Sequence, residues 1–184
     1  SSDYNYFENI LAAYLDWNWT HQKMTINAGL RAEWTTVDRT SETADFAPQS
    51  YTNLFPTASL NYTFSDELKA SISYSRRIQR PQFQDLNPFV FYIDSLVSMQ
   101  GIPSLVPSFI DAYSSSLSFK KWNLTLNYTH ADQPINTIIR VDDFDNPGIL
   151  TFCRDNIIST KLYAAALSRS VYAKGYSGYF MAGI

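Results

Sequence analysis

The chain has 184 residues, a formal net charge of -3 and a single cysteine, Cys153. This balance supplies no basic field for nucleic acid, and one cysteine permits neither an internal disulfide nor a multi-cysteine metal site. Aromatic side chains make up 16% of the sequence, which favours strands, interfaces or membrane boundaries over a helical domain. No run approaches the roughly 18 consecutive apolar residues that a membrane-spanning helix needs.

The first two predicted strands form a hairpin. Period-two alternation, which indicates a strand with two different faces, runs over 11–19 and again over 24–34. Only His21 and Gln22 lie between the two runs as a turn. The second run is close to the roughly 9–11 residues that a tilted membrane strand needs. Its apolar positions are Met24, Ile26, Ala28, Leu30, Ala32 and Trp34.

The same alternation continues along the rest of the chain. It predicts strands over 54–64, 68–75, 111–119, 122–129 and 156–168, and a last one that starts near 178. The pattern over 156–168 is noisier, with Ile158, Leu162, Ala164 and Ala166 assigned to one apolar face. In total the sequence predicts eight strands and no helix.

Short and long connections alternate between these strands. The short ones lie near 21–22, 65–67, 120–121 and 172–175, and the long ones span 39–52, 78–108 and 131–152. This is the layout of a transmembrane β-barrel with short periplasmic turns and long extracellular loops. The connection over 78–108 is too long for a compact soluble β-domain unless it has a function.

The composition of the two faces also favours a membrane barrel. The polar faces consist mostly of Ser, Thr and Asn, whereas a soluble β-domain usually carries charge on its solvent face. Aromatic residues gather at both strand ends, as a bilayer interface selects. Near the short turns these are Trp17, Trp19, Phe64, Phe119 and Trp122, and near the opposite ends Trp34, Phe55 and Tyr74. A soluble sandwich with aromatic rims remains the alternative that alternation alone leaves open.

The strand over 68–75 ends in three arginines, Arg76, Arg77 and Arg80. We expect them at the rim of the barrel, where charge costs little. There they could meet anionic lipopolysaccharide, Asp85 or Asp94 of a neighbouring loop, or an incoming ligand.

One segment, "LFPTASLNYTFSDELKASISYSRRIQRPQFQDLNPFVFYIDS", resembles a known family. The matching features are Leu54-Phe55-Pro56, Tyr74-Ser75-Arg76-Arg77, Arg80-Pro81, Asp85-Leu86-Asn87-Pro88-Phe89, Tyr92 and Asp94. "ILAAYLDW" and "INAGLRAEW" are similar to the hairpin upstream of it. The chain resembles the TonB-dependent receptors of the outer membrane protein β-barrel type from Gram-negative bacteria. It departs at Gly101-Ile102-Pro103 and Leu105-Val106-Pro107-Ser108, where the family usually has Gly-Asn-Pro and then Leu and Pro-Glu.

The resemblance implies an outer-membrane location and a barrel of about 22 strands with a plugged lumen. It also implies nutrient uptake, in which a ligand is captured outside and the TonB system supplies energy through the plug. We therefore expect residues 1–184 to be a segment of the barrel wall, without a plug domain and in contact with outer-membrane lipid. The ligand is left open as a small molecule, a glycan or a peptide.

Two other functions remain as alternatives. Eight strands can close by themselves, so the chain could form a complete outer-membrane barrel with an adhesin or structural role. It could also be a soluble β-sandwich that serves as a binding module.

The sequence predicts no enzyme, no metal site and no cofactor. His21 and His130 lie in connections at opposite ends, and no Gly-x-Ser-x-Gly motif is present. Asp142, Asp143 and Asp145 could form a calcium site, but they lack the ligand series of an EF-hand, so a solvated loop is favoured. The candidate ligand contacts are Arg76, Arg77, Arg80, Asp85, Asn87, Tyr92 and Asp94. The alternative is that these Arg and Asp residues pair with one another at the loop base.

Overall fold

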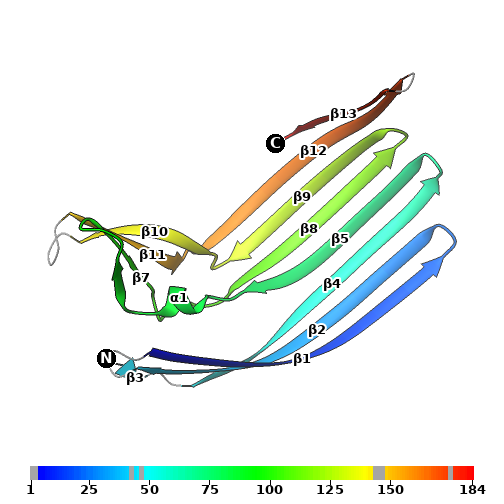
Figure 1. Ribbon diagram of the computed structural model, residues 1–184. Coiled ribbons are helices and arrows are strands. Elements are labelled where there is room, and N and C mark those ends of the chain that lie inside the picture. Colours follow the sequence, from blue (N-terminus) through cyan, green and yellow to red (C-terminus); the bar gives the residue numbers. More distant parts are fainter. Residues whose placement is uncertain (1–3, 42–43, 46–47, 143–147, 174–175) are drawn as a thin grey trace.

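The computed structural model describes residues 4–41, 44–45, 48–142, 148–173 and 176–184. Eight long strands lie side by side in one antiparallel up-and-down sheet, which confirms the predicted fold class (Figure 1). In spatial order they are β1 (Tyr4–His21), β2 (Met24–Ser41), β4 (Gln49–Ser65), β5 (Leu68–Gln79), β8 (Ser108–Phe119), β9 (Trp122–Asp132), β12 (Ser159–Ala173) and β13 (Tyr176–Gly183). The short β3 (Ala44–Asp45) pairs with β2. No helix in the described ranges is long and apolar enough to cross a membrane.

The register separates the sheet into an apolar face and a polar face. Directly opposite residues on neighbouring antiparallel strands point to the same side. One row of the apolar face contains Ile26, Leu60 and Ile72. The adjacent polar row contains Asn27, Ser59, Ser73, Ser114 and Asn127. Within this polar face Asn27 Nδ2 donates to Ser59 Oγ at 2.9 Å, and the hydroxyls of Ser71 and Ser116 are 2.8 Å apart.

The predicted facing of β12 was wrong. Tyr163, Ala165 and Leu167 stand opposite Tyr128, Leu126 and Leu124 of β9, so they belong to the apolar face. Leu162, Ala164 and Ala166 instead stand opposite Thr129, Asn127 and Thr125 of the polar face. The alternation could not decide the facing because both faces of this strand carry apolar residues. The strand also starts at Ser159, since Asn156 ends the preceding strand.

Aromatic side chains of the apolar face stand near the short turns, as predicted. Trp17, Phe64, Phe119 and Trp122 are all exposed. The rings of Tyr62 and Phe64 meet edge to face at 4.5 Å, and Trp19 stacks on His21 at 5.6 Å. At the opposite end Phe55 does not join the belt: it faces Arg31 on the polar side and is buried.

The long connections fold into a second sheet that the sequence did not predict. It consists of β10 (Ile135–Asp142), β11 (Ile149–Asn156), β7 (Val97–Gln100) and β6 (Val90–Tyr92), in that spatial order. We call it the loop sheet. β7 runs parallel to β11, whereas the other pairs are antiparallel. A single helical turn, α1 (Phe83–Leu86), precedes β6, so the expectation of no helix was also wrong.

The loop sheet and α1 lie at the long-connection end of the large sheet, next to the start of β1 (Figure 1). A small apolar core joins them there. Tyr4, Leu86, Leu105 and Ile135 are buried together, with Tyr6, Phe89 and Ile102 packed against them. Tyr4 and Tyr6 have the same facing along β1 as Glu8 and Tyr14, which is the polar side. The long connections therefore cover the polar face where it reaches the rim.

Candidate functional site

A cluster of ion-paired side chains around the fully buried Glu33 lies at the start of the long connection over 78–108. Arg80 Nη2 lies 2.6 Å from Glu33 Oε2, and Arg80 Nε lies 3.1 Å from Glu8 Oε1. Arg31 makes a second ion pair with Glu33, whose side chain is fully buried. Arg80 Nη2 also donates to Thr35 Oγ1 at 3.3 Å. Buried ions need such partners, because an unpaired buried carboxylate is costly.

This cluster anchors one end of the 78–108 connection to the wall. Arg80 starts the connection, while Glu8 belongs to β1 and Glu33 to β2. The other end is tied to β2 by Arg39, whose Nη1 donates to the Pro103 carbonyl at 2.7 Å. Arg80 therefore does hold the base of the loop through ion pairs, but its acidic partners are the strand residues Glu8 and Glu33 and not the predicted Asp85 or Asp94.

Asp85 and Asn87 stabilise the turn around α1. Asp85 Oδ2 accepts a hydrogen bond from the Gln82 N–H at 3.2 Å, and its Oδ1 lies 3.7 Å from Arg154 Nε. Asn87 Oδ1 accepts from the Phe89 N–H at 3.0 Å. The Asn87 carbonyl accepts from the Gly101 N–H at 2.9 Å, which binds the two arms of the connection together.

Arg76 and Arg77 are adjacent in sequence and face opposite sides of the sheet. Arg76 stands opposite Asp111 in the row next to Tyr74 and Tyr113, on the apolar face. Its guanidinium lies over the Phe109 ring, 5.2 Å from the centroid. Arg77 is exposed on the polar face.

Tyr92 and Asp94 lie at the tip of the loop sheet. Asp94 Oδ1 accepts a hydrogen bond from the Leu96 N–H at 2.7 Å, which shapes the turn between β6 and β7. Tyr92 is exposed, together with Phe91, Ile93 and Leu96. Within the described part of the chain, Arg77 and Tyr92 are the two predicted residues with exposed side chains and no hydrogen bond or ion pair of their own.

Sequence reasoning missed the acidic half of the ion-pair cluster. Glu33 stands next to Arg31 on a polar strand face whose other members are small, Thr25, Asn27 and Gly29, and that contrast was a usable signal. Glu8 carried no comparable signal, because it precedes the stretch in which the alternation is clear. Cys153 is buried in β11, and burial raises the pKa of its thiol.

No cluster of three or more metal-ligating side chains occurs in the ranges that the structure describes. Of the predicted calcium candidates, Asp143 and Asp145 lie outside the described residues, and Asp142 is placed only by its backbone at the end of β10.

The profile of the outer membrane protein beta-barrel family matches residues 1–177. The chain belongs to this family. This membership places the chain in the outer membrane of a Gram-negative bacterium. In membrane barrels the apolar face meets lipid and the polar face lines the lumen, so we assign the two faces of this sheet in that way. No curated protein matches the sequence significantly.

Three solved structures of outer-membrane proteins share the fold of this chain. The siderophore receptor PirA from Pseudomonas aeruginosa superposes with a TM-score of 0.59 at 10% identity, over 99% of this chain and 44% of that one. The Serratia marcescens hemophore receptor HasR, solved as a double mutant in complex with its hemophore HasA and heme, superposes with a TM-score of 0.65 at 14% identity. That match covers 90% of this chain and 32% of HasR. The copper transporter OprC superposes with a TM-score of 0.66 at 12% identity, over 94% of this chain and 27% of OprC. The chain thus spans less than half the length of each.

Proposed function

We propose that this chain is part of the barrel wall of a TonB-dependent receptor that imports a nutrient across the outer membrane. The observation that carries the proposal is the position of the loop sheet. Two long connections leave different strands and pack together over the lumen face at the extracellular rim. A wall built this way narrows the mouth of the barrel and offers an ordered surface to a ligand.

The ligand would meet the exposed residues of this surface. Tyr92 at the loop tip and Arg77 on the lumen face offer an aromatic ring, a hydroxyl and a guanidinium, which suits a small molecule, a glycan or a peptide. PirA, HasR and OprC are named for a siderophore, a hemophore and copper, so the shared fold serves ligands of different chemistry. The chemistry of uptake is binding and transport; the chain is proposed to have no enzymatic role.

Energy for import would come from the TonB system acting on a plug inside the barrel. We test this on the full native chain isolated from outer membranes. The proposal predicts an intact mass several times 21.0 kDa and binding to the purified periplasmic domain of TonB. A mass near 21 kDa, or a large protein that does not bind TonB, would contradict it.

Neither alternative function is supported by the geometry. A closed eight-stranded barrel would require β1 to pair with β13. In the described part of the sheet these two strands are the edges and do not pair with each other. The eight long strands form one sheet with an exposed apolar face, whereas a sandwich would bury that face against a second sheet.

A further inference from the structure

Four tyrosines form a continuous row across the lipid-facing side of the wall. Tyr74, Tyr113, Tyr128 and Tyr163 stand opposite one another on β5, β8, β9 and β12. Successive ring centroids are 4.8, 5.8 and 4.8 Å apart. This is the contact range of interacting aromatic rings, so the row is a rigid feature of the surface.

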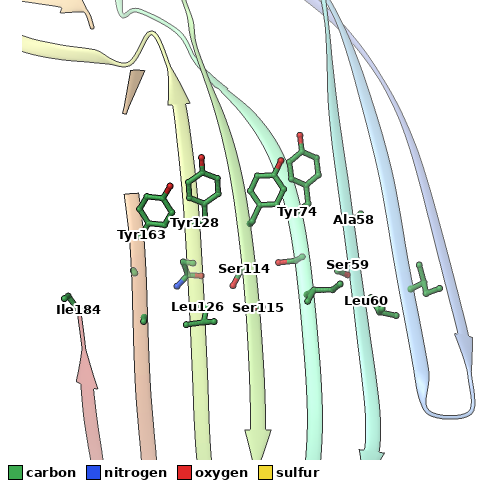
Figure 2. A pocket seen from close by; sticks show the side chains of 17 residues that line it. Ala58, Ser59, Leu60, Tyr74, Ser114, Ser115, Leu126, Tyr128, Tyr163 and Ile184 are labelled. Carbon is green, nitrogen blue, oxygen red and sulfur yellow. The ribbon is translucent and has the colours of Figure 1, made fainter. Parts of the chain in front are cut away.

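A hollow of about 820 Å³ lies along this row on the short-turn side. The next row of the apolar face alternates large and small side chains: Ile72, Ser115, Leu126 and Ala165. Because Ser115 and Ala165 are small, space remains between their larger neighbours. In Figure 2 the hydroxyl groups of Tyr74, Tyr128 and Tyr163 point away from Leu60 and Leu126. The hollow is therefore apolar with one polar border, and its volume is in the roughly 300–1,000 Å³ range of small-molecule sites.

A charged row follows directly beyond the tyrosine hydroxyls. Arg76, Asp111, His130 and Lys161 stand opposite one another, one step further toward the extracellular rim on the same face. Arg76 and Lys161 are three strand spacings apart, roughly 14 Å. Asp111 accepts a hydrogen bond from the Tyr74 hydroxyl at 2.7 Å. Asp132 has the same facing one step further out, opposite Phe109.

The backbone of this row lies close to, but just inside, the outer edge of the apolar band. Trp122 marks the belt near the short turns, and His130 lies eight residues further along β9. That distance is roughly 27 Å along the strand, or ~20 Å along the membrane normal at a tilt of about 40°, so the row lies about 5 Å inside the outer edge of an apolar band of about 25 Å. The tyrosine hollow thus faces acyl chains, while the long side chains of Arg76 and Lys161 extend outward to the headgroups.

We propose that this surface binds lipopolysaccharide, with one acyl chain in the hollow and the headgroup phosphates on Arg76 and Lys161. Guanidinium and ammonium groups bind phosphate through charge-assisted hydrogen bonds. The carboxylates of Asp111 and Asp132 repel phosphate but accept hydrogen bonds from hydroxyl groups. A row with both kinds of charge fits a phosphorylated sugar headgroup better than a simple anionic phospholipid. This inference is independent of the proposed import function.

The test is native mass spectrometry of the full chain extracted from outer membranes in mild detergent. The wild-type protein is expected to retain lipopolysaccharide. In the double variant Arg76→Ala/Lys161→Ala the fraction of protein with bound lipopolysaccharide should be at least tenfold lower than in the wild type. Arg77→Ala is the matched control, because it removes the neighbouring charge on the lumen face and should leave the bound lipid unchanged.

A second variant probes the hollow with both cations in place. Ser115→Phe should fill the space between Ile72 and Leu126 and reduce the retained lipid, with the folded state checked by heat-modifiable migration on a gel. Retention equal to wild type in folded Ser115→Phe or in the double variant would overturn the proposal. So would equal loss in Arg77→Ala, or retention of phosphatidylglycerol in place of lipopolysaccharide.

Discussion

Arg80 and Glu33 form an ion pair at 2.6 Å across 47 residues of sequence, and the Glu33 side chain is fully buried. The pair joins the first residues beyond β5 to the lumen face of β2. It is the point where the long extracellular connection is bound to the barrel wall.

Replacing Arg80 by Met should destabilise the folded protein by about 3 kcal/mol, because it leaves a buried carboxylate with one partner fewer. The size lies at the low end for such changes since Arg31 still pairs with Glu33. Urea unfolding of the full chain in detergent measures the effect. Arg77→Met should cost little, as Arg77 is exposed. The double variant Arg80→Met/Glu33→Gln should recover part of the loss; a strictly additive double variant would refute the coupling.

Gly101→Ala should loosen the long connection. A Cβ atom at this position would lie 2.5 Å from the Asn87 carbonyl oxygen and 2.7 Å from the Asp85 carbonyl oxygen, both backbone atoms that cannot swing away. We expect faster chymotrypsin cleavage among the aromatic residues of 89–92 on intact cells. Gly178→Ala is the control, because its nearest such atom is at 4.0 Å. Unchanged cleavage of Gly101→Ala would show that the turn is not tightly packed.

Leu126 and Asn127 provide a direct test of which face meets lipid. They are neighbours on β9 with opposite facing. Leu126→Lys places a charge in the apolar band and should cost about 2–4 kcal/mol of folding free energy in the bilayer. Asn127→Lys points to the lumen and should be tolerated. Equal assembly of both variants, measured as the folded fraction recovered from outer membranes, would contradict the assigned facing.

Cys153 should react slowly in the folded protein. It is 4% exposed, and burial raises the pKa of its thiol, so the reactive thiolate is scarce near neutral pH. Maleimide labelling should be fast only after unfolding. Burial of this thiol should make the folding free energy depend on pH. Below the usual thiol pKa the folded and unfolded states both keep the proton, whereas at higher pH the unfolded thiol ionises first and unfolding is favoured. Cys153→Ala should remove that alkaline contribution, and an unchanged pH profile would speak against it.

The local part of this fold was predictable and the long-range part was not. Alternation such as that of Ile26, Ala28 and Leu30 is visible within one strand, so the long strands could be identified directly. The loop sheet could not, because β7 is four residues long and pairs in parallel with β11 more than 40 residues away.

The ion-pair cluster around Glu33 was likewise predictable only in its local part. The sequence identified Arg80 as a rim residue, but its partners Glu8 and Glu33 are distant in the chain. Four of the predicted ligand contacts, Arg80, Asp85, Asn87 and Asp94, make hydrogen bonds or ion pairs within the protein that the folded structure reveals. For β12 the alanines on both faces removed the contrast on which facing predictions depend.

The most direct test of the account is the sidedness of the wall, measured by labelling single cysteines in the full chain on intact cells with a membrane-impermeant maleimide. Tyr92 lies at the tip of the loop sheet, and Glu67 lies in the short turn between β4 and β5. Tyr92→Cys should be labelled on intact cells, and Glu67→Cys only after the outer membrane is permeabilised. Labelling of Glu67→Cys on intact cells, or protection of Tyr92→Cys until permeabilisation, would contradict a wall that spans the outer membrane with its loop sheet outside.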